Sequence, residues 1–383
     1  MAEQVYRIKP GGTPGVDCEY TSLNAFETGE RANLITFGKN KVAEVYSTGN
    51  CLTGPVSFNT GWTTDSTHYI EIRAASGHEH DGIWDTSKAY GVYDTNDTVN
   101  TITVNVDVHI NKIQFSSTQV SSEGMLGLIY TTGSGKTTID RCILKLTNNY
   151  IGIPLFQIGN AVVIVTNSVV LLKQTSNGYT ALCVKAYGYF TAYNSTFVAY
   201  DYSNGDTNTI SLQTMDSSAV ITTENCYLKS SAAYWNYGSG TFNKGSKDAT
   251  SSGDATDSNL QNIAYSTATF QNVTFGSENL RLVPMLSNKL LDGGVNLISS
   301  GVTTDIIGTA RPQFGAFDIG AFENDIPLCW NYTAQYKGSS KLFKASGCGP
   351  FPRNLQVPSN VDKSTGKMVD DGEFISPNRY NIC

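Results

Sequence analysis

Short apolar segments recur along the chain between residues 138 and 275, and each has the same order of side chains. A strand-forming stretch leads to an Asn or another polar residue, then to a small residue and a second apolar stretch. The polar positions are 141, 167, 194, 225 and 272, so the repeats are 26, 27, 31 and 47 residues apart. This spacing is too short for a domain and too long for a hairpin, and the segments lack helical periodicity. The pattern therefore predicts a β-solenoid in which each repeat is one coil.

Within each repeat, a small residue precedes a larger apolar residue by two positions. Alternate residues of a strand point to one face, so stacked coils would place small residues over small ones and large over large. The pairs are Cys142 and Leu144, Ser168 and Val170, Ser195 and Phe197, Cys226 and Leu228, and Val273 and Phe275.

The turn before each pair predicts an asparagine ladder. Asn tolerates left-handed backbone angles and bonds its own backbone and that of its neighbours. Arg141 would break the ladder at one end, where a coil is more exposed. The expected members of the ladder are Asn167, Asn194, Asn225 and Asn272.

Residues 1–32 are expected to form an entry segment that caps the first coil. Thr21 or Ser22 would cap a short helix, with Leu23 and Phe26 on its apolar face. An end cap is expected because a bare solenoid end exposes strand edges.

Residues 33–325 are expected to form the β-helix. Residues 229–262, rich in small and polar residues, would be an insertion that projects from one face. Residues 326–383, broken by five prolines, would form an extended attachment arm or a small β subdomain. The early strands are expected at residues 34–37, 42–46, 69–72, 102–106 and 108–113.

The composition agrees with an all-β protein and limits its partners. Only 15% of the residues are charged, and the chain has 36 Gly and 21 Tyr, which suit turns and strands. The net charge of −7, without clusters of Lys and Arg, argues against nucleic acid as a partner. Residues 150–172 carry no charge, but Pro154, Gly159 and Asn160 interrupt them, so membrane insertion is not expected.

The N-terminus and the cysteines bear on the cellular compartment. Residues 1–14 lack the apolar core of a signal peptide, so assembly inside a host cytoplasm is expected.

Cys142, Cys183 and Cys226 lie in apolar strands and are predicted to be buried. No metal-ligand spacing occurs among the cysteines, and no cofactor is expected. The disulfide state remains open for Cys18, Cys51, Cys329, Cys348 and Cys383.

Residues 61–85 hold three of the four histidines. His78 and His80 would lie on one face of a strand, with Asp81 beside them, so a metal or catalytic cluster is one interpretation. The favoured alternative is a packed turn region in which His and Asp bond the loop backbone, because no third ligand follows at a recognisable spacing.

Aromatic residues in the later repeats suggest a glycan-binding surface. Aromatic rings beside Asp and Asn suit sugars, which offer apolar C–H faces and hydroxyl groups. The alternative is that some of the rings are strand formers or subunit contacts. The candidate residues are Tyr187, Tyr189, Tyr200, Tyr202, Tyr234, Trp235 and Tyr237.

Cleavage of a glycan would require two carboxylates at a fixed separation. Four acids fall near these aromatic residues, and the spacing does not show whether any two of them converge. Exposed carboxylates at turns are usually only solvated. The alternative catalytic residues are Asp201, Asp206, Asp216 and Glu224.

The stretch from residue 311 to residue 323 is the most specific in the chain. It contains Arg311-Pro312, Gly315 and Asp318-Ile319-Gly320-Ala321-Phe322-Glu323. It resembles the closing motif of right-handed parallel β-helix domains of the pectin-lyase-like superfamily. The resemblance spans roughly residues 20–325 and implies an all-β, right-handed parallel β-helix. It does not imply a reaction, because such helices serve as lyases, hydrolases, adhesins and virion spikes.

Residues 61–85 are similar to a segment of β-helix proteins of bacteriophages. The resemblances together imply a structural protein on the virion surface, either a tail spike or fibre or a capsid decoration. β-Helical spikes are trimers, so a homotrimer is expected, with residues 326–383 docking on sister subunits or other virion proteins. The external partner would be a host cell-surface polysaccharide. The alternative is a polysaccharide lyase or glycoside hydrolase on the same fold.

Overall fold

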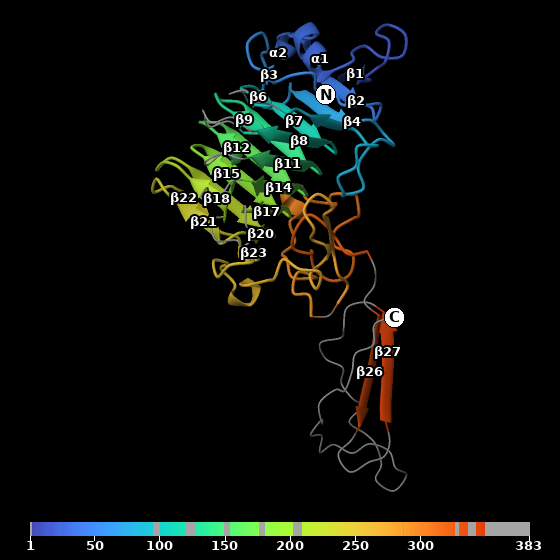
Figure 1. Cartoon of the computed structure of the whole chain (residues 1–383), viewed down its shortest axis with the longest axis vertical. Helices are drawn as coiled ribbons and strands as arrows, with labels where there is room; N and C mark the ends of the chain where they lie inside the picture. Colours follow the sequence, from blue (N-terminus) through green and yellow to red (C-terminus); the bar gives the residue numbers. More distant parts are fainter. Residues whose placement is uncertain are drawn as a thin grey trace.

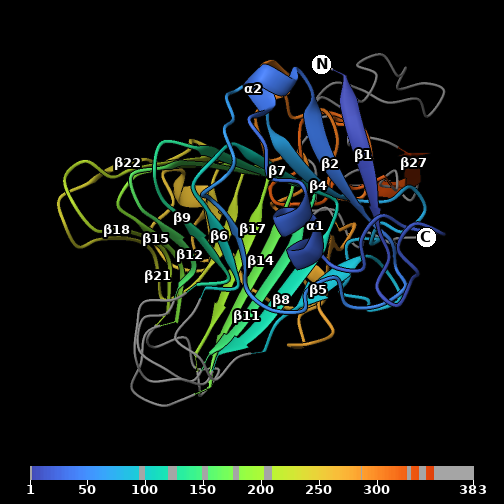
Figure 2. The ribbon, with the colours of Figure 1, turned by 90° about the horizontal axis from the view of Figure 1, so that it is seen from above.

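The computed structural model describes residues 2–94, 100–119, 127–148, 154–175, 181–201, 209–285 and 287–325, and the backbone of residues 329–335 and 342–348. Within these residues, three parallel sheets form the sides of a solenoid (Figure 1 and Figure 2). Sheet I contains β1 (Glu3–Ile8), β2 (Asn40–Val45), β4 (Ile70–Ala74), β7 (Val108–Asn111), β10 (Lys136–Asp140), β13 (Val162–Thr166), β16 (Tyr189–Tyr193), β19 (Val220–Glu224) and β22 (Thr241–Asn243).

Sheets II and III form the other two sides. Sheet II contains β5 (Tyr90–Val92), β8 (Gln114–Gln119), β11 (Ile143–Asn148), β14 (Val169–Gln174), β17 (Thr196–Tyr200), β20 (Tyr227–Lys229) and β23 (Ala249–Thr250). Sheet III contains β3 (Val56–Phe58), β6 (Ile102–Val104), β9 (Ile129–Thr131), β12 (Pro154–Ile158), β15 (Ala181–Ala186), β18 (Thr209–Thr214) and β21 (Ala232–Asn236). In the described part of the chain, six consecutive coils give one strand to every sheet. The fold is therefore an all-β parallel solenoid, as the sequence predicted.

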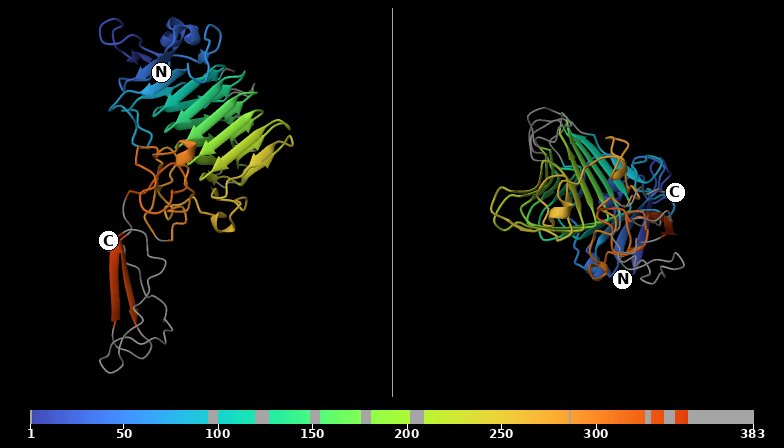
Figure 3. Two further views of the ribbon diagram at one scale, coloured as in Figure 1. Left: turned by 180° about the vertical axis from the view of Figure 1, so that it is seen from behind. Right: turned by 90° about the horizontal axis from the view of Figure 1, so that it is seen from below.

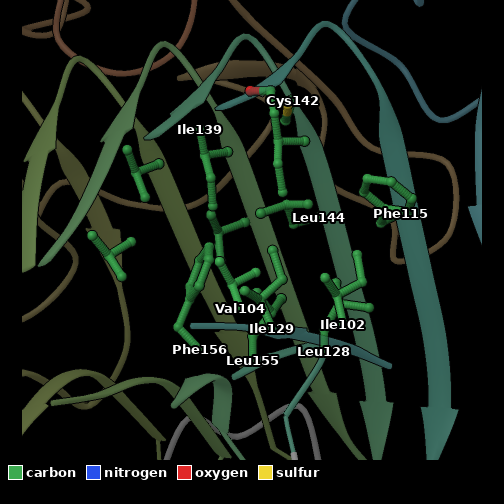
Figure 4. Packing of buried hydrophobic residues seen from close by; sticks show 14 of the residues in the cluster. Ile102, Val104, Phe115, Leu128, Ile129, Ile139, Cys142, Leu144, Leu155 and Phe156 are labelled. Carbon is green, nitrogen blue, oxygen red and sulfur yellow. Dashed lines mark hydrogen bonds between the residues drawn. The ribbon is translucent and has the colours of Figure 1, made fainter. Parts of the chain in front are cut away.

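Inward-pointing side chains stack on those of the neighbouring coils and form one long core. Figure 4 shows this packing around Ile139, Leu144 and Phe156. Full burial of a side chain such as Phe197 contributes roughly 1.5–3 kcal/mol, so the stacked rows stabilise the solenoid strongly. The row of large apolar residues predicted for the repeats is confirmed on sheet II, where Leu144, Val170, Phe197 and Leu228 occupy equivalent positions.

The turns between sheets I and II stack in the left-handed backbone conformation. Asn225 Nδ2 donates to Asn194 Oδ1 at 3.2 Å, and Asn167 Nδ2 donates to Asp140 Oδ1 at 3.0 Å. The predicted ladder is confirmed for these three asparagines. Arg141 continues the left-handed turn instead of breaking it. In the described residues the stacked positions are Lys112 (φ 55°), Arg141 (φ 54°), Asn167 (φ 49°), Asn194 (φ 44°) and Asn225 (φ 57°).

Asn272 was wrongly assigned to the ladder. It ends β24 (Phe270–Asn272), which pairs antiparallel with β25 (Asn279–Leu282) outside the solenoid. The local sequence around Asn272 imitates a repeat because a hairpin strand has the same alternation as a solenoid strand.

The first coil is capped by helix α1 (Leu23–Gly29), which lies over the end of the solenoid in Figure 2. Ser22 Oγ accepts a hydrogen bond from the Ala25 N–H at 3.1 Å, and Leu23 and Phe26 are fully buried, as predicted. No helix in the described residues is long and apolar enough to cross a membrane.

Residues 34–37 form helix α2 (Leu34–Phe37) and not the predicted strand. Asn33 Oδ1 accepts from the Thr36 N–H at 3.1 Å, and Gly38 ends the helix in the left-handed conformation. These two capping residues override the strand propensity of the four residues between them. The solenoid begins before this point, because β1 already pairs with β2 in sheet I.

The later coils continue to Thr250, so residues 229–250 do not form part of the predicted projecting insertion. β20, β21, β22 and β23 pair in parallel with earlier strands. The small residues permit close contact between coils: a Cβ at Gly238 would lie 2.0 Å from the Met215 carbonyl oxygen. Residues 258–260 form a short 3-10 helix, η1 (Ser258–Leu260).

After the last coil, residues 264–325 fold back along the outer face of sheet II, and this segment is named the closing module (Figure 1 and Figure 3). It contains β24, β25 and the 3-10 helix η2 (Ile298–Ser300). Leu171 and Val198 of sheet II share an apolar cluster with Leu280, Ile306 and Phe322 of the module. Residues 33–325 therefore comprise the solenoid and a separate covering layer.

Residues 329–335 and 342–348 form an antiparallel hairpin of β26 (Cys329–Gln335) and β27 (Leu342–Cys348), in which Cys329 and Cys348 are directly opposite in register. Cys18 and Cys51 are buried free thiols, as are the three cysteines predicted to lie in the core. Cys383 and the rest of the arm lie outside the described residues.

Candidate glycan-binding surface

Four aromatic side chains lie where sheet III turns into sheet I, and this surface is named the aromatic corner. It consists of Tyr187, Tyr189, Trp235 and Tyr237. Tyr189 is 54% exposed, Trp235 47% and Tyr237 71%, while Tyr187 is half-buried. Elsewhere in the described residues, Phe37 of α2 is the exposed aromatic side chain. Exposed aromatic surface is therefore concentrated at one edge of the solenoid.

The parallel register brings the corner residues together from distant parts of the sequence. The N–H groups of Tyr187, Met215 and Tyr237 each donate to the strand end of the preceding coil, at 2.7, 2.8 and 3.1 Å. The three residues therefore occupy equivalent places on consecutive coils, about 4.8 Å apart. Tyr187 and Tyr237 thus lie two coils apart with the flexible Met215 between them.

Glycine after each tyrosine makes this stacking possible. A Cβ at Gly188 would lie 2.2 Å from the Gly159 carbonyl oxygen, and Gly238 approaches the preceding coil equally closely. The backbone is packed against the coil behind it, so the neighbouring tyrosine side chains are directed to the surface.

An ionised carboxylate lies beside the stacked rings. Asp216 Oδ1 accepts from the Ser218 hydroxyl at 2.8 Å and from the Ser218 N–H at 2.9 Å. These hydrogen bonds hold the pKa of Asp216 below its usual value, so the group is an acceptor at neutral pH. Aromatic faces beside a charged acceptor match the apolar faces and hydroxyl groups of sugars.

The structure separates the other candidate aromatic residues from this surface. Tyr200 is 6% exposed, and its hydroxyl lies 2.7 Å from that of Tyr265 beneath the closing module. Tyr234 points into the end of the solenoid, where its hydroxyl donates to Asp248 Oδ2 at 2.8 Å. Burial raises the pKa of both tyrosines. Tyr202 lies outside the described residues.

The three alternative catalytic acids that the structure describes do not converge. Asp201 follows β17 at the turn from sheet II to sheet III, and Asp216 lies at the turn from sheet III to sheet I. Glu224 ends β19 at the third turn, where Oε1 accepts from the Lys247 N–H at 2.8 Å. Asp201, Asp216 and Glu224 therefore lie at three different corners of the solenoid. The two carboxylates of a glycosidase, by contrast, lie about 5–10 Å apart. Asp206 lies outside the described residues.

The histidines predicted as possible metal ligands have other partners. His78 Nδ1 lies 2.6 Å from the Ser47 hydroxyl, and His80 Nε2 donates to the Arg141 carbonyl at 2.9 Å. His80 Nδ1 accepts from the Gly82 N–H at 3.1 Å, and burial lowers the pKa of His80 to about 4. In the described part of the chain, no three His, Cys, Asp or Glu side chains form a group that could hold a metal ion.

The loop around His80 contacts the closing module instead. A Cβ at Gly82 would lie 2.5 Å from the Phe322 ring, and Arg281 Nη2 donates to the Asp81 carbonyl at 2.7 Å. The favoured interpretation of residues 61–85, a packed turn region, agrees with these contacts.

The residues of the closing motif form a buried charge cluster. Arg311 is nearly inaccessible and donates to Glu323 Oε2 at 2.8 Å and to the carbonyls of Asp318 and Gly320 at 3.0 Å. Asp305 Oδ2 accepts from the Glu323 N–H at 3.0 Å. Burial raises the pKa of Asp318 and of Glu323. The motif thus holds the closing module together and does not form an open site.

No protein-family model matches the chain, and no curated protein matches it. Among solved structures, the chain is similar to the crystal structure of pectate lyase Pel9A, with a TM-score of 0.34 and 12% sequence identity. The alignment covers 85% of this chain and 97% of that chain. This similarity concerns the fold and gives no information on a reaction or a substrate.

Proposed function

We propose that the protein is a bacteriophage structural protein, displayed on the virion surface, that binds host surface glycan through the aromatic corner. The exposure of Tyr189, Trp235 and Tyr237 on one edge is the observation that carries the proposal. Stacking on rings that a rigid solenoid holds in place requires little ordering on binding. The wide separation of Asp201, Asp216 and Glu224 favours binding over cleavage.

The virion assignment rests on the similarity of residues 61–85 to a segment of bacteriophage β-helix proteins. The closing motif resembles that of the pectin-lyase-like superfamily, whose helices include virion spikes among other proteins. In this proposal residues 326–383 attach the protein to sister subunits or to other virion proteins, and the assembly is a homotrimer located on the particle as a tail spike, a tail fibre or a capsid decoration. The binding activity needs no cofactor, because it uses ring faces and hydrogen bonds alone.

Binding of purified host surface polysaccharide to the full chain, measured by calorimetry, tests the proposal. Trp235→Ala and Tyr237→Ala should each weaken binding by about 5- to 150-fold, since one ring in contact with a ligand is worth roughly 1–3 kcal/mol.

Phe37→Ala is the matched control, because Phe37 is an exposed ring at the opposite end of the solenoid. It should leave binding unchanged. Equal loss in all three variants, or undiminished binding by the double variant Trp235→Ala, Tyr237→Ala, would remove the aromatic corner as the binding surface.

A further inference from the structure

Two lysines on the outer face of sheet II converge on one aromatic ring. Lys145 of β11 and Lys173 of β14 each place Nζ 4.6 Å from the ring centroid of Phe275. Phe275 lies in the turn between β24 and β25 of the closing module. The two ammonium groups are therefore no farther apart than about twice that distance, on adjacent strands at the margin of the module.

No carboxylate in the described residues forms an ion pair with either lysine. Glu278 interacts electrostatically with Lys145. The carboxylate oxygens of Glu278, however, accept hydrogen bonds from the Gly276 N–H at 2.9 Å and from the Tyr200 hydroxyl at 3.4 Å. Burial raises the pKa of Glu278, so its charged form is disfavoured. In a protein of net charge −7, two neighbouring cations thus lack a full counter-charge.

Hydroxyl groups surround the two lysines on the same face of the sheet. Ser116 is the register partner of Lys145, and Thr147 lies between Thr118 and Lys173. All three hydroxyl-bearing side chains are partly exposed, and within the described residues their hydroxyl groups make no hydrogen bond. Two ammonium groups and three free O–H donors on a flat surface form a donor set for the oxygens of an anion.

We propose that Lys145 and Lys173, with the hydroxyls of Ser116, Thr118 and Thr147, form a binding subsite for the sulfate or carboxylate groups of an acidic polysaccharide. A polymer suits this surface better than a free ion, because an open sheet face offers a small anion few ligands. In a polymer, a neighbouring anionic group can bind the lysines when one group dissociates. Two lysines are too few for a nucleic-acid backbone.

The subsite is separate from the aromatic corner. Lys145 and Lys173 lie on sheet II, whereas Tyr187 and Tyr237 lie at the turn from sheet III to sheet I. Loss of one activity therefore leaves the other intact, and the two proposals fail or succeed independently.

Binding of dextran sulfate to the full chain at low ionic strength, measured by calorimetry, tests the subsite, with uncharged dextran as the matched polymer. Lys145→Gln and Lys173→Gln should each weaken dextran sulfate binding by about 5- to 10-fold, and each should lower the salt dependence of log K by up to about one unit. Lys173→Arg keeps the charge and should retain binding, which separates lost charge from a folding defect.

Lys39→Gln is the control, because Lys39 is an exposed lysine near the Phe37 ring at the other end of the solenoid. The proposal requires that Lys39→Gln leave dextran sulfate binding unchanged. Equal weakening by Lys39→Gln would show a diffuse charge effect and overturn the subsite. Sodium sulfate binding as tightly as the polymer, or dextran binding equally well, would overturn the assignment to an acidic polysaccharide.

Discussion

Single residues at turns decide how the coils of this solenoid stack. The ladder of Asn167, Asn194 and Asn225 could be predicted from spacing, because the left-handed turn needs a residue that tolerates it and bonds its neighbours. The burial or exposure of individual tyrosines could not be predicted from the sequence. Tyr200 points out of sheet II as an outward strand residue should, and only the closing module, distant in sequence, buries it.

Asn225→Ala should destabilise the protein by about 2–4 kcal/mol, measured by chemical denaturation. Asn225 Oδ1 accepts from the Val295 N–H at 2.9 Å and Nδ2 donates to the Val295 carbonyl at 2.8 Å, so the substitution leaves both groups without a partner and places Ala in a left-handed turn. Lys112→Ala, at an equivalent turn, should change stability by less than about 0.5 kcal/mol. Similar effects of the two substitutions would contradict this role of the asparagine side chain.

His80 should make the protein less stable in acid. Its pKa is about 4 in the folded protein and 6.5 ordinarily, so the neutral ring stabilises the fold fully above pH 6.5, and this contribution is lost as the pH falls toward 4. The loss is about 3 kcal/mol over this window. Buried carboxyl groups such as Glu323 titrate in the opposite sense, so the prediction concerns the difference between the wild type and His80→Gln. Parallel stability curves for the two proteins between pH 7 and 4.5 would refute it.

At the scale of elements, the closing module is the part of the fold that the sequence described least well. The motif from Arg311 to Glu323 indicated how a β-helix ends, but it did not reveal that the module lies on the outer face of sheet II. Residues 229–250 were wrongly assigned to an insertion because small and polar residues suit both loops and tightly stacked coils. Lys145, Lys173 and Phe275 meet only through this layer, and no local pattern in the sequence marks them.

Glu323→Ala should destabilise the closing module by about 3–5 kcal/mol, because it leaves Arg311 buried without its ion-pair partner. Hydrogen exchange of the amides in residues 264–325 measures this directly.

Replacing both partners, in the double variant Arg311→Met, Glu323→Met, should restore part of the stability, because the Arg311 guanidinium is then no longer buried without its ion-pair partner. A Glu323→Ala loss below about 1 kcal/mol would show that the buried ion pair does not hold the module.

At the scale of the whole molecule, the surfaces of the solenoid differ in what they can contact. The closing module covers the part of sheet II around Leu171 and Val198, and α1 covers the first coil. In the proposed trimer, sister subunits would contact sheet I, sheet III or the arm, and glycan binding requires that they leave the aromatic corner exposed. The period of the repeats predicted the solenoid correctly because stacking imposes the same register on every coil.

The native mass of the purified protein, measured by light scattering with and without residues 326–383, tests the central claim that this is a subunit docked through its arm. The account predicts three times the 41.4 kDa mass of one chain for the full protein, and a monomer after removal of the arm. A stable monomer in both forms would contradict the account.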